Sequence, residues 1–368
     1  MTREGNFGFL ETFSLIAIAL INKVFYTSPM IIISELGTSA WLGTLISCLT
    51  SLSFFGLLYI LMKRFQGQDL FQIFEKVTGK LVGRGLTLLF SFYFLYYTAI
   101  NVREFTAILK AYSLPFTPIS LIVLSLLAIA AAMAYVGLEG IARVAYVFAF
   151  PIFGGLVLIL VLAYPVYDWD YLRPIFGYGL ENTIIKGFLR SSAYGEIIIL
   201  AIIINSIHGL KTFRQVGVNA LLLKGVVMSL CCACILAAFQ YPSSSEHLSG
   251  MFQLSRVIYH SRFLQRIEAI FLFIWVFASA VTVALSFYVS LQAYCRTFLI
   301  ENHRPLLLSF LLLTSTVAFI PRNLSQILEI HVIAIREYSL LLVYAVPILV
   351  LFLALILKRG GKSNAKSP

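Results

Sequence analysis

Long apolar stretches alternate with short polar ones along almost the whole chain. With about 20 apolar residues for each membrane crossing, this pattern predicts ten transmembrane segments. They span residues 9–34, 40–62, 85–110, 119–136, 141–164, 179–207, 216–239, 267–298, 305–320 and 339–357. We therefore expect an all-α polytopic membrane protein in which residues 1–368 form a single transmembrane domain.

Polar residues interrupt two of these segments in the middle. The first breaks at Asn22-Lys23, with Tyr26-Thr27-Ser28-Pro29 after it, and the sixth breaks between Ser191 and Glu196. Unwound backbone survives at membrane depth only where it is buried in protein or lines a cavity. Broken segments at corresponding places in two halves point to a binding site near the bilayer midplane. We expect two five-helix repeats of inverted topology, at 9–164 and 179–357.

Composition agrees with a membrane protein and excludes several other classes. The chain is 60% hydrophobic and 12% charged, against roughly 25% charged for soluble domains. Its net charge of +11 comes from basic residues spread over short loops, which favours membrane orientation over nucleic-acid binding. The five cysteines lie inside apolar segments, so we expect neither a disulfide framework nor a metal site. The cluster Cys231-Cys232-Ala233-Cys234 is interpreted as helix packing.

An even number of crossings places both termini on one side, and the positive-inside rule predicts which. The loops on the terminal side and the tail at 358–368 carry more lysine and arginine than the opposite loops, so we expect cytoplasmic termini. The basic residues assigned to the opposite side are Lys110, Arg173, Lys186, Arg190, Arg256, Arg262, Arg266, Arg322 and Arg336. Within 240–266, the spacing of Phe252, Leu254 and Ile258 predicts an amphipathic helix on that outer surface.

Lys23 lies near the middle of the first segment. A lysine there costs about 2.5–3.5 kcal/mol unless it is compensated. It could snorkel to the interface. Alternatively its ammonium could sit in a cavity, paired with Glu196 or Glu104, or in the place of a coupling cation.

Short polar side chains accompany Lys23 in the first break. Asn22, Thr27 and Ser28 could form hydrogen bonds with the carbonyls of their own helix. They could instead line a site in which a half-helix beginning near Pro29 offers free N–H groups to a carboxylate.

The second break combines hydroxyls, a glycine and an acid at membrane depth. Gly195 would permit unwinding, and Glu196 could accept a ligand ammonium, pair with Lys23 or act as a gate. The alternative is a structural cap on the following half-helix. The candidate residues here are Ser191, Ser192, Tyr194, Gly195 and Glu196.

The third segment carries Asn101, Arg103 and Glu104 near its end. We interpret Tyr96, Tyr97 and Arg103 as an aromatic and snorkelling belt at the membrane interface. Asn101 is not explained by such a belt and is kept as a site candidate. The sequence contains no HExxH, phosphate loop or Gly-x-Ser-x-Gly motif, so an enzyme is not expected.

Five stretches recur in a characteristic order over nearly the whole chain. They are Thr27-Ser28-Pro29 with 35–42 after it, Asp170 to Phe176, Tyr194-Gly195-Glu196-Ile197-Ile198, Arg266 to Phe271 leading to Trp275, and Ile320 to Leu324. In this order they resemble the GerAB-type B subunits of endospore germinant receptors. The resemblance implies the amino acid–polyamine–organocation superfamily with a LeuT-type five-plus-five inverted repeat, whose first and sixth helices are broken.

The resemblance also implies a function. Such a protein works in the spore inner membrane with a larger A subunit and a lipoprotein C subunit, and binds a small nutrient such as an L-amino acid. Its site would lie at Asn22, Lys23, Val24, Thr27, Asn101 and the second break. Many relatives have a glycine-containing turn where this chain has Asn22-Lys23-Val24, so Lys23 could take over carboxylate binding or block it. A germinant receptor subunit is expected, with a secondary amino acid transporter as the alternative and no cofactor in either.

Overall fold

The computed structural model describes residues 7–259 and 266–360. Helices make up most of this part of the chain, with short 3-10 or π-helical elements labelled η. The first half contains α1 (Phe9–Ile21), η1 (Asn22–Phe25), α2 (Ser28–Leu36), η2 (Gly37–Ser39), α3 (Ala40–Arg64), α4 (Leu70–Thr78), α5 (Lys80–Tyr112), α6 (Ile119–Val136), α7 (Leu138–Leu162), η3 (Tyr164–Val166) and η4 (Trp169–Leu172).

The second half begins with another interrupted helix. Its elements are α8 (Leu180–Leu189), η5 (Arg190–Ile197), α9 (Ile198–Ile202), η6 (Ile204–Ser206), α10 (Gly209–Phe239), η7 (Ser243–Ser245), α11 (Gly250–Val257), α12 (Ile267–Thr297), η8 (Arg304–Leu306), α13 (Leu307–Ala318), η9 (Gln326–Val332), α14 (Ile333–Ser339), η10 (Leu340–Ala345) and α15 (Val346–Ile356).

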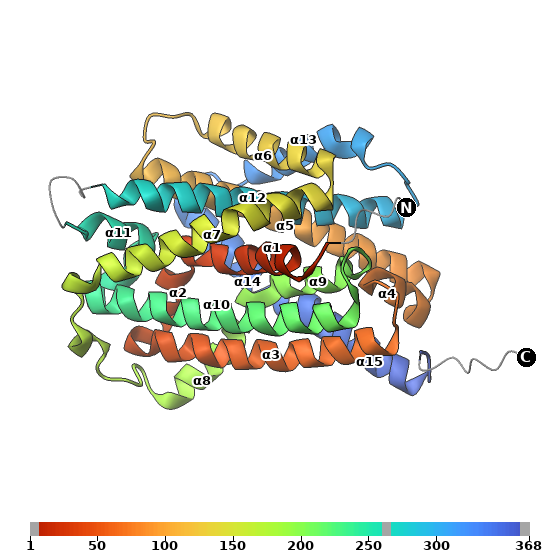
Figure 1. Ribbon diagram of the computed structural model, residues 1–368, viewed down its shortest axis with the longest axis horizontal. Helices are drawn as coiled ribbons and strands as arrows, with labels where there is room; N and C mark the ends of the chain where they lie inside the picture. Colours follow the sequence, from red (N-terminus) through yellow and green to blue (C-terminus); the bar gives the residue numbers. More distant parts are fainter. Residues whose placement is uncertain (1–6, 260–265, 361–368) are drawn as a thin grey trace, which may run out of the picture.

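The long helices run side by side along the longest axis of the molecule (Figure 1). Seven helical runs in the described residues are long and apolar enough to cross a membrane, and the first of them, Ser28–Arg64, joins α2 to α3. The interrupted run α8-η5-α9, the shorter α13, and α1 with η1 lie among them. The start of α1 and the end of α15 lie at the same end of the bundle (Figure 1). We call this end the terminal side and the other the opposite side.

The interrupted first helix lies in the centre of the bundle. α1 packs on α7, α10 and α12, while α12 also packs on α5 and α6. The side chains of α1 from Leu15 to Ile21 are completely or almost completely buried. Because all sides of α1 contact protein, its interrupted backbone is protected from lipid, as a broken span requires.

The predicted segments agree with the structure except at the last one. The helical run begins at Gln326, whereas the predicted segment began at 339. The prediction missed the first half of the run because its polar residues lower the local hydropathy; they are Glu329, His331, Arg336 and Glu337. Arg336 was expected in an opposite-side loop. It lies inside α14 with 9% of its surface exposed. Lys186 and Arg190, also assigned to the opposite side, lie in α8 and at the start of η5, within the predicted sixth segment.

The expected amphipathic helix within 240–266 is α11. Its apolar side chains are buried against protein, and Phe252 stacks on Tyr112 of α5 and contacts Phe271 of α12. Ser249 caps α11 and donates to the carbonyl of Phe25 at 2.8 Å. The apolar face of α11 therefore packs against protein and covers the first break. Residues 260–265 and the tail beyond 360 lie outside the described residues.

Helices α3 and α10 approach closely where α10 has glycine. A Cβ atom on Gly217 would lie 1.9 Å from the ring of Phe55, which itself stacks on Phe213 with 5.2 Å between ring centroids. We expect Gly217→Ala to destabilise the protein by about 1–3 kcal/mol, the usual cost of overpacking. Thermal unfolding of the purified protein in detergent would measure this.

Gly56→Ala on α3 is the matched control, because a Cβ there meets nothing within 4 Å. The combination of Gly217→Ala with Phe55→Leu, which shortens the ring, should recover part of the loss. An unfolding temperature of Gly217→Ala equal to that of the wild type would contradict this account of the α3–α10 contact.

Candidate functional site

The first break consists of one turn of 3-10 helix followed by an extended residue. η1 ends at Phe25, and Tyr26 has φ −93° and ψ −159°, so the chain changes direction before α2 starts at Ser28. Pro29 lies in the first turn of α2, where its missing N–H and fixed φ are tolerated. The Tyr26 hydroxyl donates to Ser279 Oγ of α12 at 3.0 Å, and Ser279 donates to Asn22 Oδ1 at 3.3 Å.

The second break is wound more tightly than an α-helix but is not unwound. Residues 190–197 form the 3-10 helix η5 between α8 and α9. Gly195 is not among the positive-φ glycines, and a Cβ placed on it would only make an ordinary contact with Val343. The expectation that Gly195 permits unwinding is therefore wrong for this conformation. The α-helix of this span is interrupted because residues 190–197 are wound as a 3-10 helix, without any extended residue.

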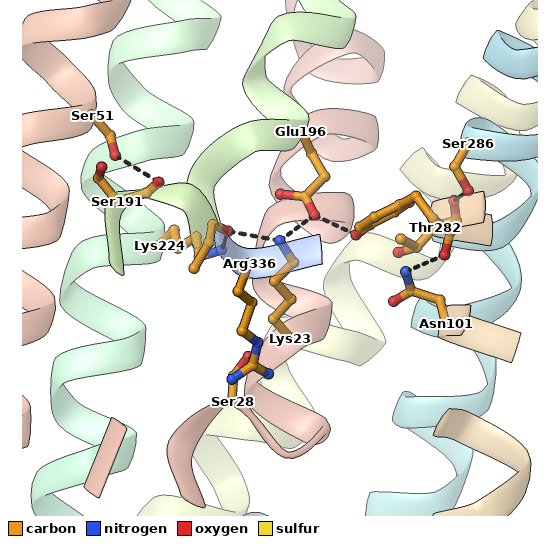
Figure 2. A network of polar contacts seen from close by, with 12 residues as sticks. Lys23, Ser28, Ser51, Asn101, Ser191, Glu196, Lys224, Thr282, Ser286 and Arg336 are labelled. Carbon is orange, nitrogen blue, oxygen red and sulfur yellow. Dashed lines mark hydrogen bonds and ion pairs between the residues drawn. The ribbon is translucent and has the colours of Figure 1, made fainter. Parts of the chain in front are cut away.

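An ion pair joins the two breaks. Lys23 Nζ lies 2.5 Å from Glu196 Oε1 and donates to the carbonyl of Ala193 at 3.0 Å. The Tyr97 hydroxyl of α5 donates to the same Glu196 oxygen, and the Lys23 ammonium lies 5.5 Å from the centre of the Tyr97 ring. Figure 2 shows Lys23 and Glu196 pointing toward one another. Of the interpretations of Lys23, the pair with Glu196 is the one found.

A second lysine, which sequence analysis did not single out, reaches the same carbonyl. Lys224 of α10 is completely buried, donates to the Ala193 carbonyl, and lies 4.5 Å from the centre of the Tyr194 ring. Among the described residues it has no carboxylate within ion-pair distance. Its cost inside an apolar segment, about 2.5–3.5 kcal/mol, was the signal that could have identified it.

A protein carboxylate and a guanidinium lie at the start of α2. Glu104 Oε1 accepts hydrogen bonds from the Thr27 amide at 3.1 Å and the Thr27 hydroxyl at 2.5 Å. Arg336 Nη2 donates to Ser28 Oγ at 3.0 Å, and Figure 2 shows its side chain directed at Ser28. Glu104 therefore occupies the position at which a half-helix N-terminus attracts a carboxylate.

These groups surround a small cavity of about 30 Å³. Its charged lining residues are Lys23, Glu104 and Arg336, and Tyr26, Ser28, Tyr97, Ile100, Asn101, Val332 and Ile335 complete it. That volume is about the share of one water molecule, so the cavity as it stands is too small for an amino acid. Asn101, a candidate from the sequence, is one of these lining residues, and its side-chain amide donates to the Tyr97 carbonyl at 2.7 Å.

The other predicted site residues lie around the cavity rather than on its lining. Val24 is fully buried in the apolar core, and Tyr194 donates to the Thr44 carbonyl of α3 at 3.2 Å. The carbonyl of Ser191 accepts from Ser51 and Tyr344. The hydroxyls of Ser191 and Ser192 and the Glu196 Oε2 atom are buried without a hydrogen-bond partner in the described part of the chain. They offer hydrogen-bonding capacity that this conformation does not use.

The predicted interfacial belt on α5 is wrong for two of its three residues. Tyr97 and Arg103 are buried, with Tyr97 bonded to Glu196 and Arg103 donating to the Pro321 carbonyl at 3.3 Å. Tyr96 contacts His331 Nδ1 at 2.7 Å. Their position late in the segment suggested a membrane interface. The prediction failed because the sequence does not show that the last helix packs over this part of α5.

Ion pairs hold the two ends of the bundle. On the opposite side, Arg190 of η5 donates from Nε at 2.6 Å and from Nη2 to the carboxylate of Glu35 in α2. On the terminal side, Asp69 caps α4 and accepts from Arg296 of α12 at 2.6 Å and from Asn205 at 3.1 Å. A cavity of about 540 Å³ with a mixed polar and apolar lining opens beside Asp69 and Arg296. The two broken helices are therefore joined on the opposite side. On the terminal side the end of the second one, at Ile202 and Ile203, borders this cavity, which we call the vestibule.

Residues 7–259 and 266–360 contain no group of three or more acidic, histidine or cysteine side chains placed to hold a metal ion. The central groups are an ammonium, a guanidinium, two carboxylates and several hydroxyls, which can form charged and neutral hydrogen bonds. Small-molecule sites place a few convergent polar groups in an otherwise apolar pocket.

The backbone arrangement is similar to that of a solved transporter. A Na⁺-coupled sialic acid symporter in its substrate-bound outward-open state superposes with a TM-score of 0.63 at 10% sequence identity, covering 91% of this chain and 78% of the symporter. This similarity shows a transporter-like helical fold and carries no information on the ligand.

Sequence comparison identifies the family. Spore germination protein KB of Bacillus subtilis (strain 168) is 23% identical over 366 residues, covering 92% of this chain and 95% of the relative. Spore germination protein B2 of the same organism is 22% identical over 368 residues, covering 98% of each. The family model described as "Spore germination protein" matches residues 8–327. The chain belongs to the spore germination protein family, in agreement with its resemblance to GerAB-type B subunits.

Proposed function

We propose that this protein is the B subunit of an endospore germinant receptor and binds a small nutrient, an L-amino acid, between its two broken helices. The observation that carries the proposal is the buried cluster in which Lys23 and Glu196 join the two breaks beside the cavity lined by Glu104 and Arg336. Family membership supports the role in germination, and the transporter-like fold supports a central binding site.

Binding would act by shifting the balance between two conformations. In this conformation the cavity holds about one water molecule, so a nutrient must enter a conformation in which the cavity is wider. A ligand moves such an equilibrium only through its different affinities for the two conformations. We propose that the two halves, 9–164 and 179–357, move against each other, and that an A subunit and a lipoprotein C subunit relay the change in the spore inner membrane. The termini would be cytoplasmic.

The second candidate is a secondary amino acid transporter, favoured by the vestibule of about 540 Å³ on the terminal side. Purified protein in liposomes separates the two. We expect saturable binding of a labelled amino acid without uptake into the liposomes, because a sensor must respond to its ligand but need not release it on the far side.

Saturable uptake without partner subunits would contradict the sensor and favour the transporter. Spores that lack this gene provide the test in the cell: they should lose germination with a subset of a panel of nutrients. Unchanged germination with every nutrient would contradict the proposed receptor.

A further inference from the structure

Two opposite charges line the central cavity without pairing with each other. Glu104 and Arg336 are 6% and 9% exposed, both line the cavity, and neither takes part in an ion pair among the described residues. Each is instead held by the turn before α2, Glu104 by Thr27 and Arg336 by Ser28. The turn thus keeps an anionic and a cationic group side by side at one cavity.

Both groups keep unused hydrogen-bonding atoms. Glu104 uses only Oε1, while the hydrogen bonds of Arg336 within the described chain leave from Nη2. The second oxygen of Glu104 can accept from an ammonium. The remaining N–H groups of Arg336 form part of a planar fork that matches the geometry of a carboxylate.

We propose that Arg336 binds the carboxylate and Glu104 the ammonium of a zwitterionic α-amino acid. The inference rests on the proposed function and specifies which residues recognise the nutrient. Lys23, which sequence analysis made the candidate for the carboxylate, is already matched by Glu196 at 2.5 Å. It therefore completes the link between the two breaks, and Arg336 is the lining cation without a carboxylate partner.

The surrounding charge restricts the side chain of the ligand. With Lys23 matched by Glu196 and Arg336 held beside Glu104, Lys224 remains behind the cavity lining as a buried cation whose partners are a carbonyl and an aromatic ring. The cluster thus holds three basic groups, Lys23, Lys224 and Arg336, against the two carboxylates Glu104 and Glu196, and a net positive charge in a low-dielectric site repels a further one. The substrate class is therefore a small amino acid with an uncharged side chain, and basic amino acids are rejected.

The experiment pairs the removal of each ligand charge with the removal of its protein partner. The purified full-length chain in nanodiscs is titrated with L-alanine and with L-valine. Each amino acid is compared with its amide, which lacks the carboxylate, and with its deamino acid, which lacks the ammonium. The deamino acids are propionate for alanine and 3-methylbutanoate for valine. Loss of either charge should weaken binding to the wild type by at least about tenfold, as expected for a charged hydrogen bond.

The variants then assign each charge to a residue. In Arg336→Met the amino acid should bind no more tightly than its amide, so the ratio of these two affinities falls to near one. The ratio of the affinities for the amino acid and its deamino acid should stay as in the wild type. Glu104→Gln should show the reverse. Arg336→Lys, which keeps the charge without the fork, should give an intermediate ratio. Because each ratio is measured within one variant, it does not depend on how much protein folds.

Arg103→Met is the matched control, because Arg103 is a buried cation of α5 that contacts Pro321 and does not line the cavity. It should keep both ratios. The test of Lys224 compares L-lysine with its uncharged analogue L-norleucine. We expect the wild type to bind L-lysine at least about tenfold more weakly than L-norleucine. In Lys224→Met the affinity for L-lysine should rise relative to that for L-norleucine.

The possible failures are distinguishable. Binding of the amino acids with ratios unchanged in Arg336→Met and Glu104→Gln would overturn the inference and leave the proposed function standing. If neither amino acid binds the wild-type chain, the proposed function for this subunit is overturned and the inference with it.

Discussion

Replacing Glu196 by glutamine, or Lys23 by alanine, is expected to abolish the response of spores to their nutrient. Each change leaves one member of a buried pair without its counter-charge: Glu196 is 3% exposed and Lys23 16%. Breaking a buried pair costs about 3–5 kcal/mol, and here the pair holds the two broken helices together. Germination of variant spores, followed as loss of optical density over a nutrient series, measures the effect.

Loss of response must be separated from loss of protein. Immunoblots of spore membranes give the amount of each variant, and the double variant Lys23→Ala with Glu196→Gln removes both charges together. We expect the double variant to accumulate better than either single variant, because no unpaired charge stays buried, and still not to respond. A double variant that germinates like the wild type would show that the pair serves stability alone. Wild-type germination of both single variants would refute the site.

Replacing Glu35 by glutamine is expected to make the receptor more sensitive. The Arg190 guanidinium binds Glu35 through two nitrogens and ties η5 to α2 on the opposite side. Hydrogen bonds to charged groups contribute about 1.5–3 kcal/mol each, and the pair is only partly exposed, at 11% and 22%. If opening on that side separates the two broken helices, losing one such bond favours the open form by about tenfold or more.

The nutrient concentration for half-maximal germination should then fall by a similar factor, and Arg190→Met should shift it in the same direction. The matched control is Glu139→Gln, which removes an exposed ion pair with Arg143 on α7, 42% and 75% exposed. Such pairs contribute at most about 1 kcal/mol, so the dose response should not move. A requirement for more nutrient in Glu35→Gln would mean that the pair stabilises the responsive conformation instead.

Much of the fold could be predicted because the bilayer imposes local requirements. Each crossing needs about 20 apolar residues, which identified the segments to within several residues everywhere except at the last helix. There the buried Arg336 and its polar neighbours broke the pattern, since a hydropathy window averages over faces that contact lipid and faces that contact protein. The π-helical elements η9 and η10 were not predicted either.

By itself, the sequence determined which backbone is interrupted and that Lys23 and Glu196 must be compensated, because helix-breaking polar residues and charges are costly in lipid wherever they occur. Only the tertiary structure decided what compensates them. Tyr97, Lys224, Glu104 and Arg336 come from α5, α10 and α14, and whether such a side chain faces lipid, a neighbouring helix or the cavity depends on how those helices pack. That is set by contacts between residues up to 309 positions apart in the chain, which no local pattern records.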